Sequence, residues 1–482
     1  MNRDKTHLFH AGLSDLEAVA ISRHGFPIAS LPIRYLGLPL MHRKLRISEY
    51  EPLLDQIARK FRSWAVKSLS YAGRTQLISS VIYGIINFWL STFSLPKGCL
   101  KKIESFCSRF LWAGNIDGSK GAKVSWSTVC LPKCEGGLGL RRLTDWNSTL
   151  SLRFIWFLFS ENVSLWTQWH KYHNIKASSF WELKESPRDS WTWKALLRLR
   201  PLAARFVKAF VGNGDRVSFW FDSWTPLGPL INLLGHQGPR SLRLPREGKV
   251  KDACSATSWI IPSPRSEEAL LLHVHLTTIP VPAPLSQDEY CWVVDGIKCN
   301  GYSAQRTWSA LRPRADKVPW SSQIWFKGAV PRHAFNMWIA NLNRLPTKQR
   351  MCSWGIITSL VCSLCSLAKE SRDHLLLTCS YSAQVWLQIL ARIDPSRPLF
   401  ISWGELLSWL RASSVSAPSI LRKVAAQTTV YHIWKQRNNV VHNQIIIPTA
   451  NVFKLINREI KNIITVRQPR RKFRHLMQLW IS

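Results

Sequence analysis

Four side chains close together in the sequence have the types and spacing of a metal site. Cys362 and Cys365 are separated by two residues, and His374 and Cys379 follow in the same short stretch. Two such thiols can turn back on one metal ion, and a His and a Cys spaced i and i+5 can complete a tetrahedron from a short helix or turn. Zn²⁺ accepts three thiolates and one imidazole in closed structural sites that leave no position for a reactive water. The sequence therefore predicts a structural zinc site.

The alternative is that these cysteines are small buried hydrophobic residues, as free cysteine often is. The chain holds 11 Cys, so some clustering by chance is expected. We favour the zinc site because the spacing and the ligand types agree. The loop between the ligand pairs is polar, and residues 375–377 are three leucines that can pack the site against a larger body.

Helices are predicted on both sides of this stretch. Trp320–Phe326 is a short helix, and Pro331 opens a second helix whose apolar face carries Phe335, Trp338, Ile339 and Leu342. Pro346–Trp354 makes a third. After the Cys/His stretch, a helix runs through Val385, Trp386 and Ile389.

The first third of the chain predicts an all-helical module. Apolar residues recur at helical spacing from Leu53 to Trp64, from Leu77 to Trp89 and from Leu100 to Leu111, and residues 144–170 form a further helix. Residues 75–96 carry no charge and are nearly long enough to cross a bilayer. Their Ser, Thr, Asn and Gly content and their helical stripe favour a buried helix over a membrane span.

Weaker β signals lie elsewhere. Pro and Gly exclude a helix in much of residues 1–45, where short extended pieces are expected. Alternating Val217, Phe219 and Phe221 after a Gly-Asn-Gly-Asp turn predict a strand, and residues 225–289 are interpreted as loop-dominated. Asp295-Gly296 lies between two apolar runs and predicts a hairpin. The expected fold class is mainly α with a minor β component.

The charge balance indicates a polyanionic partner. Lys and Arg number 65 against 29 Asp and Glu, which gives a net charge of +36, and 46% hydrophobic residues exclude a disordered chain. Nucleic acid is the expected partner, and an anionic membrane surface is second. Two places could contact phosphates: Arg141 and Arg142 after a GGLG run, and the basic run Arg470, Arg471, Lys472 and Arg474. The first also fits a helix-entry turn, and the second a solvated tail.

The N-terminus lacks the apolar core of a signal peptide and an arginine-rich presequence. An intracellular, reducing compartment is therefore expected, where clustered cysteines bind metal more often than they form disulfides.

Several stretches together resemble the C-terminal half of plant non-LTR (LINE-type) retrotransposon reverse transcriptases. In this chain, LPIRYLGLPL and SWAVKSLSYAGRTQLISSVIYGIINFW are similar to the family's segment after the polymerase palm. Later blocks of the family are similar to VGNGDRVSFWFDSW and YHIWKQRNNVVHN. The stretch from about Asp295 to Leu390 resembles the reverse transcriptase zinc-binding domain, in which Cys362, Cys365, His374 and Cys379 match the zinc ligands.

The resemblance implies a division into modules. The expected parts are 1–45, a remnant downstream of the palm; 46–170, a helical thumb-like module; 171–290, a mixed, loop-rich middle region; 291–392, the zinc-binding domain; and 393–482, a basic helical C-terminal region.

One departure from the family decides the functional expectation. The family's polymerase needs paired aspartates to hold two Mg²⁺ ions, and this sequence contains no Asp-Asp pair. Residues 1–6 resemble the strand just downstream of those aspartates, so the chain is expected to begin after them. We expect a catalytically inactive fragment that retains Zn²⁺ and binds RNA or DNA through phosphates, with no membrane or small-molecule partner. The resemblance implies that the protein is located in the nucleus.

Two alternatives stay open. One is a zinc-scaffolded protein–protein interaction module, whose partner would be a polymerase subunit acting in trans. The other is a truncated gene model of an active RNA-directed DNA polymerase.

Overall fold

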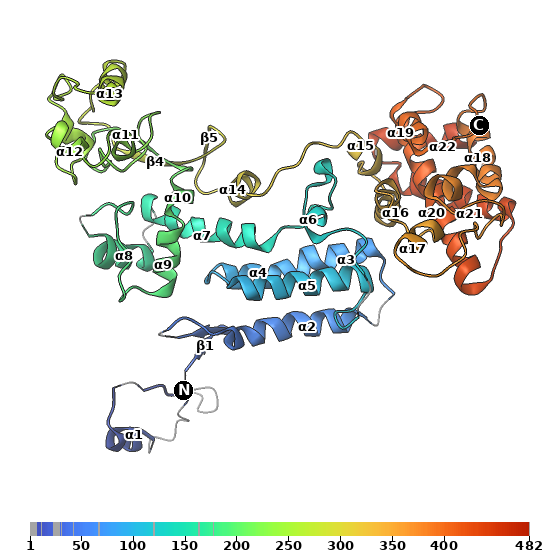
Figure 1. The fold of residues 1–482 in the computed structure, drawn as a ribbon, viewed down its shortest axis with the longest axis horizontal. Coiled ribbons are helices and arrows are strands. Elements are labelled where there is room, and N and C mark those ends of the chain that lie inside the picture. The colour runs from blue at the N-terminus through green and yellow to red at the C-terminus, as the bar shows by residue number, and fades with distance from the viewer. Residues whose placement is uncertain are drawn as a thin grey trace. The chain divides into compact units, whose positions relative to one another are not determined.

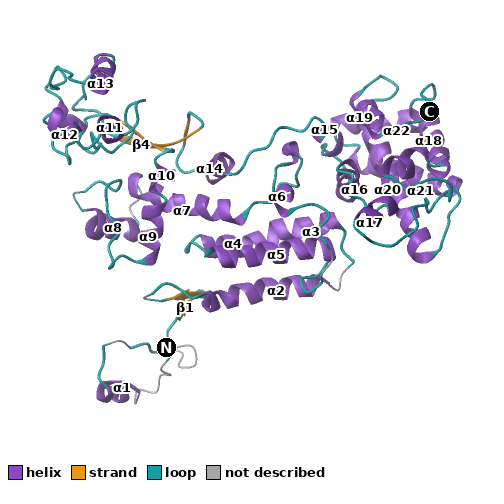
Figure 2. Cartoon of the chain, viewed as in Figure 1, coloured by secondary structure: helices purple, strands orange, loops and turns teal. Residues whose placement is uncertain are grey.

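The chain is mainly helical with two small antiparallel sheets, which confirms the predicted fold class (Figures 1 and 2). The computed structural model describes residues 7–10, 12–22, 29, 31–41, 43–65, 68–118, 121–161, 164–176 and 178–481. Residues 1–6, compared above with a palm strand, lie outside the described residues. Two compact units are formed: unit 1 is Met1–Asp55, Ile85–Lys102 and Arg142–Pro313, and unit 2 is Gln56–Gly84, Ile103–Arg141 and Arg314–Ser482.

The elements follow the chain in this order. The elements of unit 1 are α1 (Asp15–Ser22), β1 (Ile33–Tyr35), β2 (Leu38–Leu40), η2 (Ile47–Tyr50), α7 (Leu143–Phe159), α8 (Leu165–His170), η5 (Lys171–Ile175), α9 (Trp191–Arg198), α10 (Arg200–Ala203), β3 (Val207–Phe210), α11 (Leu230–Leu234), α12 (Gly238–Ser241), η6 (Val250–Ala253), α13 (Glu267–Thr277), β4 (Glu289–Val294), β5 (Ile297–Cys299) and α14 (Ala304–Leu311). Those of unit 2 are α3 (Tyr71–Leu77), η3 (Ile78–Ile82), α6 (Trp126–Val129), η4 (Lys133–Glu135), α15 (Ser321–Ile324), α16 (Pro331–Asn341), α17 (Lys348–Ser353), η7 (His374–Thr378), α18 (Ser380–Ile393), α19 (Trp403–Arg411), α20 (Ser419–Asn443), α21 (Thr449–Arg467), η8 (Arg471–Phe473) and α22 (Leu476–Ile481). Three helices belong partly to each unit: α2 (Glu51–Ala65), α4 (Tyr83–Leu90) and α5 (Lys97–Ala113).

The uncharged stretch 75–96 is helical as far as Leu90, as predicted, but a π-helical turn interrupts the helix. The turn η3 adds a residue to the repeat, so after Ile82 the next fully buried isoleucine is Ile86, and Ile85 is only half-buried. No helix among the described residues is long and apolar enough to cross a membrane.

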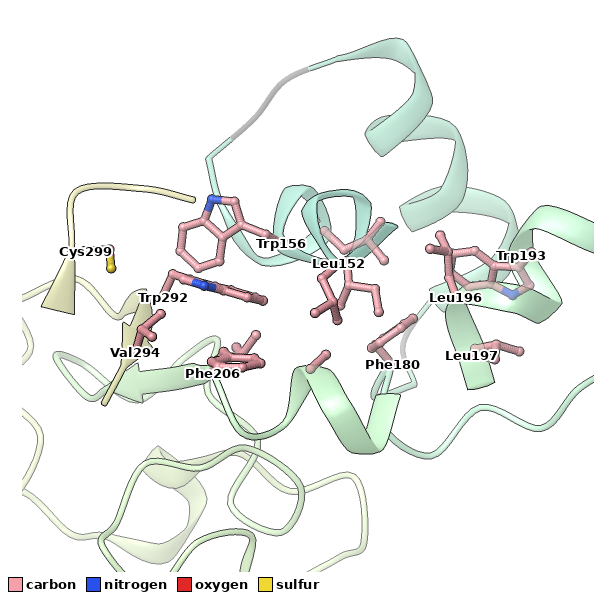
Figure 3. Close-up of a cluster of buried hydrophobic side chains, with 14 residues drawn as sticks. Leu152, Trp156, Phe180, Trp193, Leu196, Leu197, Phe206, Trp292, Val294 and Cys299 are labelled. Carbon is pink, nitrogen blue, oxygen red and sulfur yellow. The ribbon is translucent and has the colours of Figure 1, made fainter. Parts of the chain in front are cut away.

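A cluster of buried aromatic residues forms one core of unit 1 (Figure 3). The ring of Trp292 on β4 stacks on Phe206 at 5.2 Å between centroids and meets Trp156 of α7 edge-on at 5.9 Å. Strand β4 is the centre of the sheet β3–β4–β5. The predicted hairpin is confirmed: Asp295 and Gly296 both have positive φ, 49° and 76°, as a two-residue turn between β4 and β5 requires.

The strand predicted at residues 217–221 is wrong, because buried carboxylates take the backbone groups that a sheet would use. Asp288 accepts hydrogen bonds from the N–H groups of Gly212, Gly214, Arg216 and Val217. The N–H of Ser218 donates to Asp222 at 2.7 Å, and the segment turns back on itself. Besides β5, the strand that pairs with β4 is β3, which lies upstream and was not predicted. The region 225–289 is also less irregular than predicted, since α13 forms within it behind the cap of Ser266.

Unit 2 is organised around its longest helix, α20, which contacts α16, α18, α19 and α21. The helices predicted around the Cys/His stretch are present as α15, α16, α17 and α18, with Pro331 in the first turn of α16. The Cys/His stretch lies between α17 and α18. It consists of a loop followed by the π-helical turn η7.

Candidate metal centre and basic surface

The four predicted metal ligands meet in unit 2. The ligand atoms of Cys362, Cys365, His374 and Cys379 all lie within 4.8 Å of one another. Cys362 Sγ lies 3.9 Å from Cys379 Sγ, and Cys365 Sγ lies 3.3 Å from His374 Nε2. Among the residues that the structure describes, this is the one group of three or more His, Cys, Asp or Glu side chains able to hold an ion.

These distances fit a tetrahedral zinc site. With the usual Zn–S and Zn–N bond lengths, tetrahedral angles place two sulfurs about 3.8 Å apart and a sulfur and a nitrogen about 3.6 Å apart. The two printed separations fall close to these values. Cys362 and Cys379 are buried, while Cys365 and His374 are partly exposed. A Zn²⁺ ion held by all four would have a complete coordination shell and would serve as a structural cross-link.

The surroundings of the Cys362 sulfur favour a thiolate. The pKa of Cys362 is lowered to about 5 by the hydrogen bond with Cys379, and the N–H groups of Leu364 and Cys365 contribute to the same shift against the effect of burial. Metal ligands must be deprotonated, so this environment suits a metal-bound sulfur. The pKa of Cys379 is raised, first by the hydrogen bond with Cys362 and then by burial, and the N–H groups of Ser382 and Tyr381, in the first turn of α18, act against this rise.

Local chain geometry presents the ligands. The loop from Cys362 closes on itself, since the N–H of Ser366 donates to Cys362 O at 2.9 Å and Ser366 takes a positive φ of 56°. The π-helical turn η7 carries His374, and the N–H of Cys379 donates to His374 O at 2.7 Å, which brings the last two ligands together. The leucines of η7 are buried, as predicted.

A buried ion pair fastens the ligand loop to α20. Glu370 and Arg437 have side chains exposed by 0% and 3%, and Arg437 Nη2 lies 2.7 Å from Glu370 Oε1. The second carboxylate oxygen accepts hydrogen bonds from the N–H of Ser363 at 3.1 Å and from its hydroxyl at 2.8 Å. The N–H of Lys348 also donates to Glu370 at 3.0 Å. Burial raises the pKa of Glu370, but the bonds from Arg437 and Ser363 outweigh it and the net pKa is lowered.

The comparisons with known proteins agree with this centre. The family described as zinc-binding in reverse transcriptase matches residues 302–386, which include all four ligands. Residues 302–386 are a reverse transcriptase zinc-binding domain. Arg437 lies outside the matched range, so the ion pair with Glu370 ties this domain to a helix that follows it.

Two proteins of Arabidopsis thaliana are distantly similar to parts of this chain. One, named a "putative ribonuclease H protein", is 25% identical over 374 residues, which cover 73% of this chain and 58% of the relative. The other, named an "uncharacterized mitochondrial protein", is 29% identical over 146 residues, which cover 29% of this chain and 95% of the relative. The chain thus spans little more than half the length of the first of these relatives.

The GGLG run before Arg141 serves packing. A Cβ on Gly137 would lie 2.0 Å from Leu131 O, and the carbonyl of Gly136 accepts a hydrogen bond at 2.8 Å from the indole of Trp338, in the zinc-binding domain. Arg141 is half-buried and Arg142 is exposed, and the division between the two units falls between them. Burial lowers the pKa of Arg141. Of this predicted pair, Arg142 is the more accessible to a ligand.

The second predicted basic site is well presented. Arg470, Arg471, Lys472 and Arg474, here called the C-terminal basic cluster, are all exposed around the turn η8. Between them Phe473 is buried, with 1% of its surface exposed. The buried ring holds the turn in place while the charged side chains point into solvent.

Sequence reasoning missed Glu370 and Arg437 as parts of the metal centre. The available signal was that each lies within a block resembling the retrotransposon family, but their pairing is not a local pattern.

Proposed function

We propose that this chain binds nucleic acid through backbone phosphates, that its zinc-binding domain serves as a structural scaffold, and that the chain does not itself copy nucleic acid. The C-terminal basic cluster carries this proposal. It places four exposed cations on one turn, in a protein with a net charge of +36. Clustered arginines and lysines neutralise phosphates and release the counterions condensed on them.

Neighbouring cations extend the cluster. Burial and the charge of Lys472 lower the pKa of Lys423 on α20, and burial and the charge of Arg470 lower the pKa of Arg467 at the end of α21. A cation whose pKa is lowered by like charges gains from an anionic ligand, because the ligand relieves the repulsion. An extended polyanion is the ligand class that suits such a group.

The proposal assigns this chain binding rather than catalysis. Two-metal polymerase and nuclease chemistry needs clustered carboxylates. The sequence has no Asp-Asp pair, and the metal-ligand group found among the described residues contains no carboxylate. The relative named for ribonuclease H extends well beyond the matched region, so its named activity is not transferred here.

A salt titration of RNA and DNA binding tests the proposal. We expect log K to fall steeply with log salt, and replacement of the C-terminal basic cluster by glutamine should reduce that slope by about 2–4, since each lost phosphate contact contributes about 0.9. A matched control replaces four exposed cations on α2 and α5, namely Arg59, Lys60, Lys101 and Lys102. Binding that does not respond to salt, or an equal loss in both variants, would contradict the proposal. Primer extension by the purified chain would contradict its non-catalytic part.

A specific observation supports a second candidate, a protein-interaction module. Exposed apolar side chains are concentrated beside the metal centre: Trp354, Ile356, Ile357, Leu360, Val361 and Leu367. Grouped exposed apolar residues are typical of protein interfaces. A polymerase subunit supplied in trans would then bind here, with an affinity that changes little with salt. Substitution of Ile357 and Leu367 by serine should abolish that association and leave nucleic-acid binding intact.

A further inference from the structure

A short aromatic segment of unit 1 is not explained by the metal centre or by the C-terminal basic cluster. It consists of α8 and the π-helical turn η5, and covers Leu165–Ile175 (α8 in Figure 1). The hydroxyl of Ser164 caps its start by accepting from the N–H of Thr167. The turn ends at Lys176, whose φ is 53°.

One side of this segment is fastened to the core. Trp166 packs on Phe154 of α7 with ring centroids 5.4 Å apart. The ring of His170 stacks on Trp193 at 4.4 Å with an interplanar angle of 13°. His170 is buried, and burial lowers its pKa to about 4, so the ring is neutral near pH 7. Its Nδ1 lies within hydrogen-bond distance, 2.8 Å, of the amide of Asn174.

The other side exposes aromatic rings. Trp169 is 53% exposed and Tyr172 is 77% exposed, and His173 lies between them in space. The centroid of His173 is 4.9 Å from that of Trp169 and 4.9 Å from that of Tyr172. Trp169 also touches His170 at 4.9 Å. A continuous series of rings therefore runs from the core to the surface, and the outer rings are preorganised by the inner ones.

The surroundings of these rings are cationic. Residues 164–176 contain no Asp or Glu and include Lys171 and Lys176, both exposed. Arg216 is close enough that its charge, added to the effect of burial, lowers the pKa of Lys171. Exposed rings beside lysines match a ligand that offers both flat faces and anionic groups.

We propose that Trp169, Tyr172 and His173 form a stacking platform for the unpaired bases of single-stranded RNA or DNA, with Lys171 and Lys176 contacting the adjoining phosphates. The inference rests on the proposed nucleic-acid binding and names the strand form that is preferred. Every base presents a π face, so rings on a rigid support accept any sequence, whereas a duplex keeps its bases stacked inside. A π-helical turn at this position fits a functional site, because such turns are kept there despite their cost.

The experiment compares a 20-nucleotide oligo(U) with a 20-base-pair duplex, both binding the full zinc-loaded chain at one salt concentration. Trp169→Leu/Tyr172→Leu should weaken oligo(U) binding on the order of 10- to 100-fold and leave duplex binding nearly unchanged, since stacking is lost and charge is not. Trp169→Phe/Tyr172→Phe should retain most of the affinity. The control Tyr35→Leu/Phe88→Leu removes two other exposed aromatic residues of unit 1 and should have no effect.

Two further measurements keep the test decisive. Tyr172→Leu alone, at the most exposed ring, preserves the fold and should still cost several-fold in oligo(U) affinity. Photo-crosslinking of an oligonucleotide containing 5-iodouracil should map to a peptide within residues 164–176. Wild-type oligo(U) affinity in the leucine variants, or an equal loss for oligo(U) and duplex, would overturn the platform.

Failure of the platform and failure of the proposed function give different results. If the wild-type chain binds both probes with steep salt dependence and the leucine variants match it, only the platform is wrong. If the wild-type chain binds neither probe, or binds without salt dependence, the nucleic-acid function itself is wrong.

Discussion

The pair Glu370–Arg437 should control both the stability of unit 2 and the retention of zinc. The two side chains are almost completely buried, with Arg437 Nη2 and Nε at 2.7 and 3.0 Å from one carboxylate oxygen. Removing one member of such a pair leaves a buried charge without compensation and costs about 3–5 kcal/mol. Replacing both members with apolar side chains of similar size is often nearly neutral.

The two single variants should differ in a predictable order. Glu370→Ala leaves the guanidinium unpaired and also removes the acceptor for Ser363 and Lys348, so its cost should reach the upper end of that range, about 5 kcal/mol. Arg437→Met leaves Glu370 with its other donors and should cost about 3 kcal/mol. Because Ser363 lies inside the Cys-x-x-Cys loop, Glu370→Ala should also weaken zinc binding on the order of 10- to 100-fold.

The assay combines denaturant unfolding, hydrogen exchange of residues 360–380 and zinc transfer to a coloured chelator. A double-mutant cycle made of Glu370→Leu, Arg437→Met and the double variant Glu370→Leu/Arg437→Met isolates the coupling between the two residues. The exposed pair Glu289–Lys298 is the control, since Glu289→Ala should change stability by no more than about 1 kcal/mol. If Glu370→Ala unfolds at the wild-type denaturant concentration and releases zinc at the wild-type rate, the assigned role of this ion pair is refuted.

Three further predictions concern unit 2. Elemental analysis should find one zinc per chain, and a strong chelator should expose the Cys/His loop to hydrogen exchange; a zinc-free chain with the same exchange pattern would count against the site. Gly328→Ala should displace the C-terminal basic cluster and weaken phosphate binding several-fold, because φ is +105° and the new Cβ would lie 2.7 Å from Phe473; unchanged binding would show that this glycine does not position the turn. Glu459 accepts a hydrogen bond from His432 at 2.6 Å, and its pKa lies well below its usual range. Its contribution to stability is therefore complete above pH 4.5 and is lost as the pH falls through the lower folded-state pKa. Glu459→Gln should cost about 3 kcal/mol of stability at pH 7, and the difference in melting temperature between this variant and the wild type should become smaller in acid.

The features that sequence analysis found correctly are local ones. The metal ligands fall within 18 consecutive positions, and their types alone limit the chemistry. The Asp295-Gly296 turn is likewise decided by two residues whose backbone accepts positive φ. Pro331 marks a helix start for an equally local reason, because its ring fixes φ at a helical value.

The missed features depend on partners far away in the chain. Asp288 lies more than 70 residues from the N–H groups it binds, and it turns an alternating apolar segment away from a strand. Glu370 and Arg437 are separated by 67 positions, and no residue next to either of them in the sequence indicates that they form an ion pair. The periodicity of apolar residues indicates only which secondary structure a segment favours by itself. It carries no information about a carboxylate from another segment that hydrogen-bonds to the backbone.

Helix α20 shows that only exposed charged side chains should be counted when net charge is used to infer a ligand. Its sequence contributes to a C-terminal region with a large excess of cations, yet Arg422 and Arg437 are buried and face Asp394 and Glu370. Those two charges are already paired and cannot contribute to a salt-dependent phosphate contact. The slope of log K against log salt should therefore follow the exposed cations around η8 rather than the total over the C-terminal region. A slope that falls when Lys472 is neutralised and stays constant in Glu370→Leu/Arg437→Met would establish this distinction by measurement.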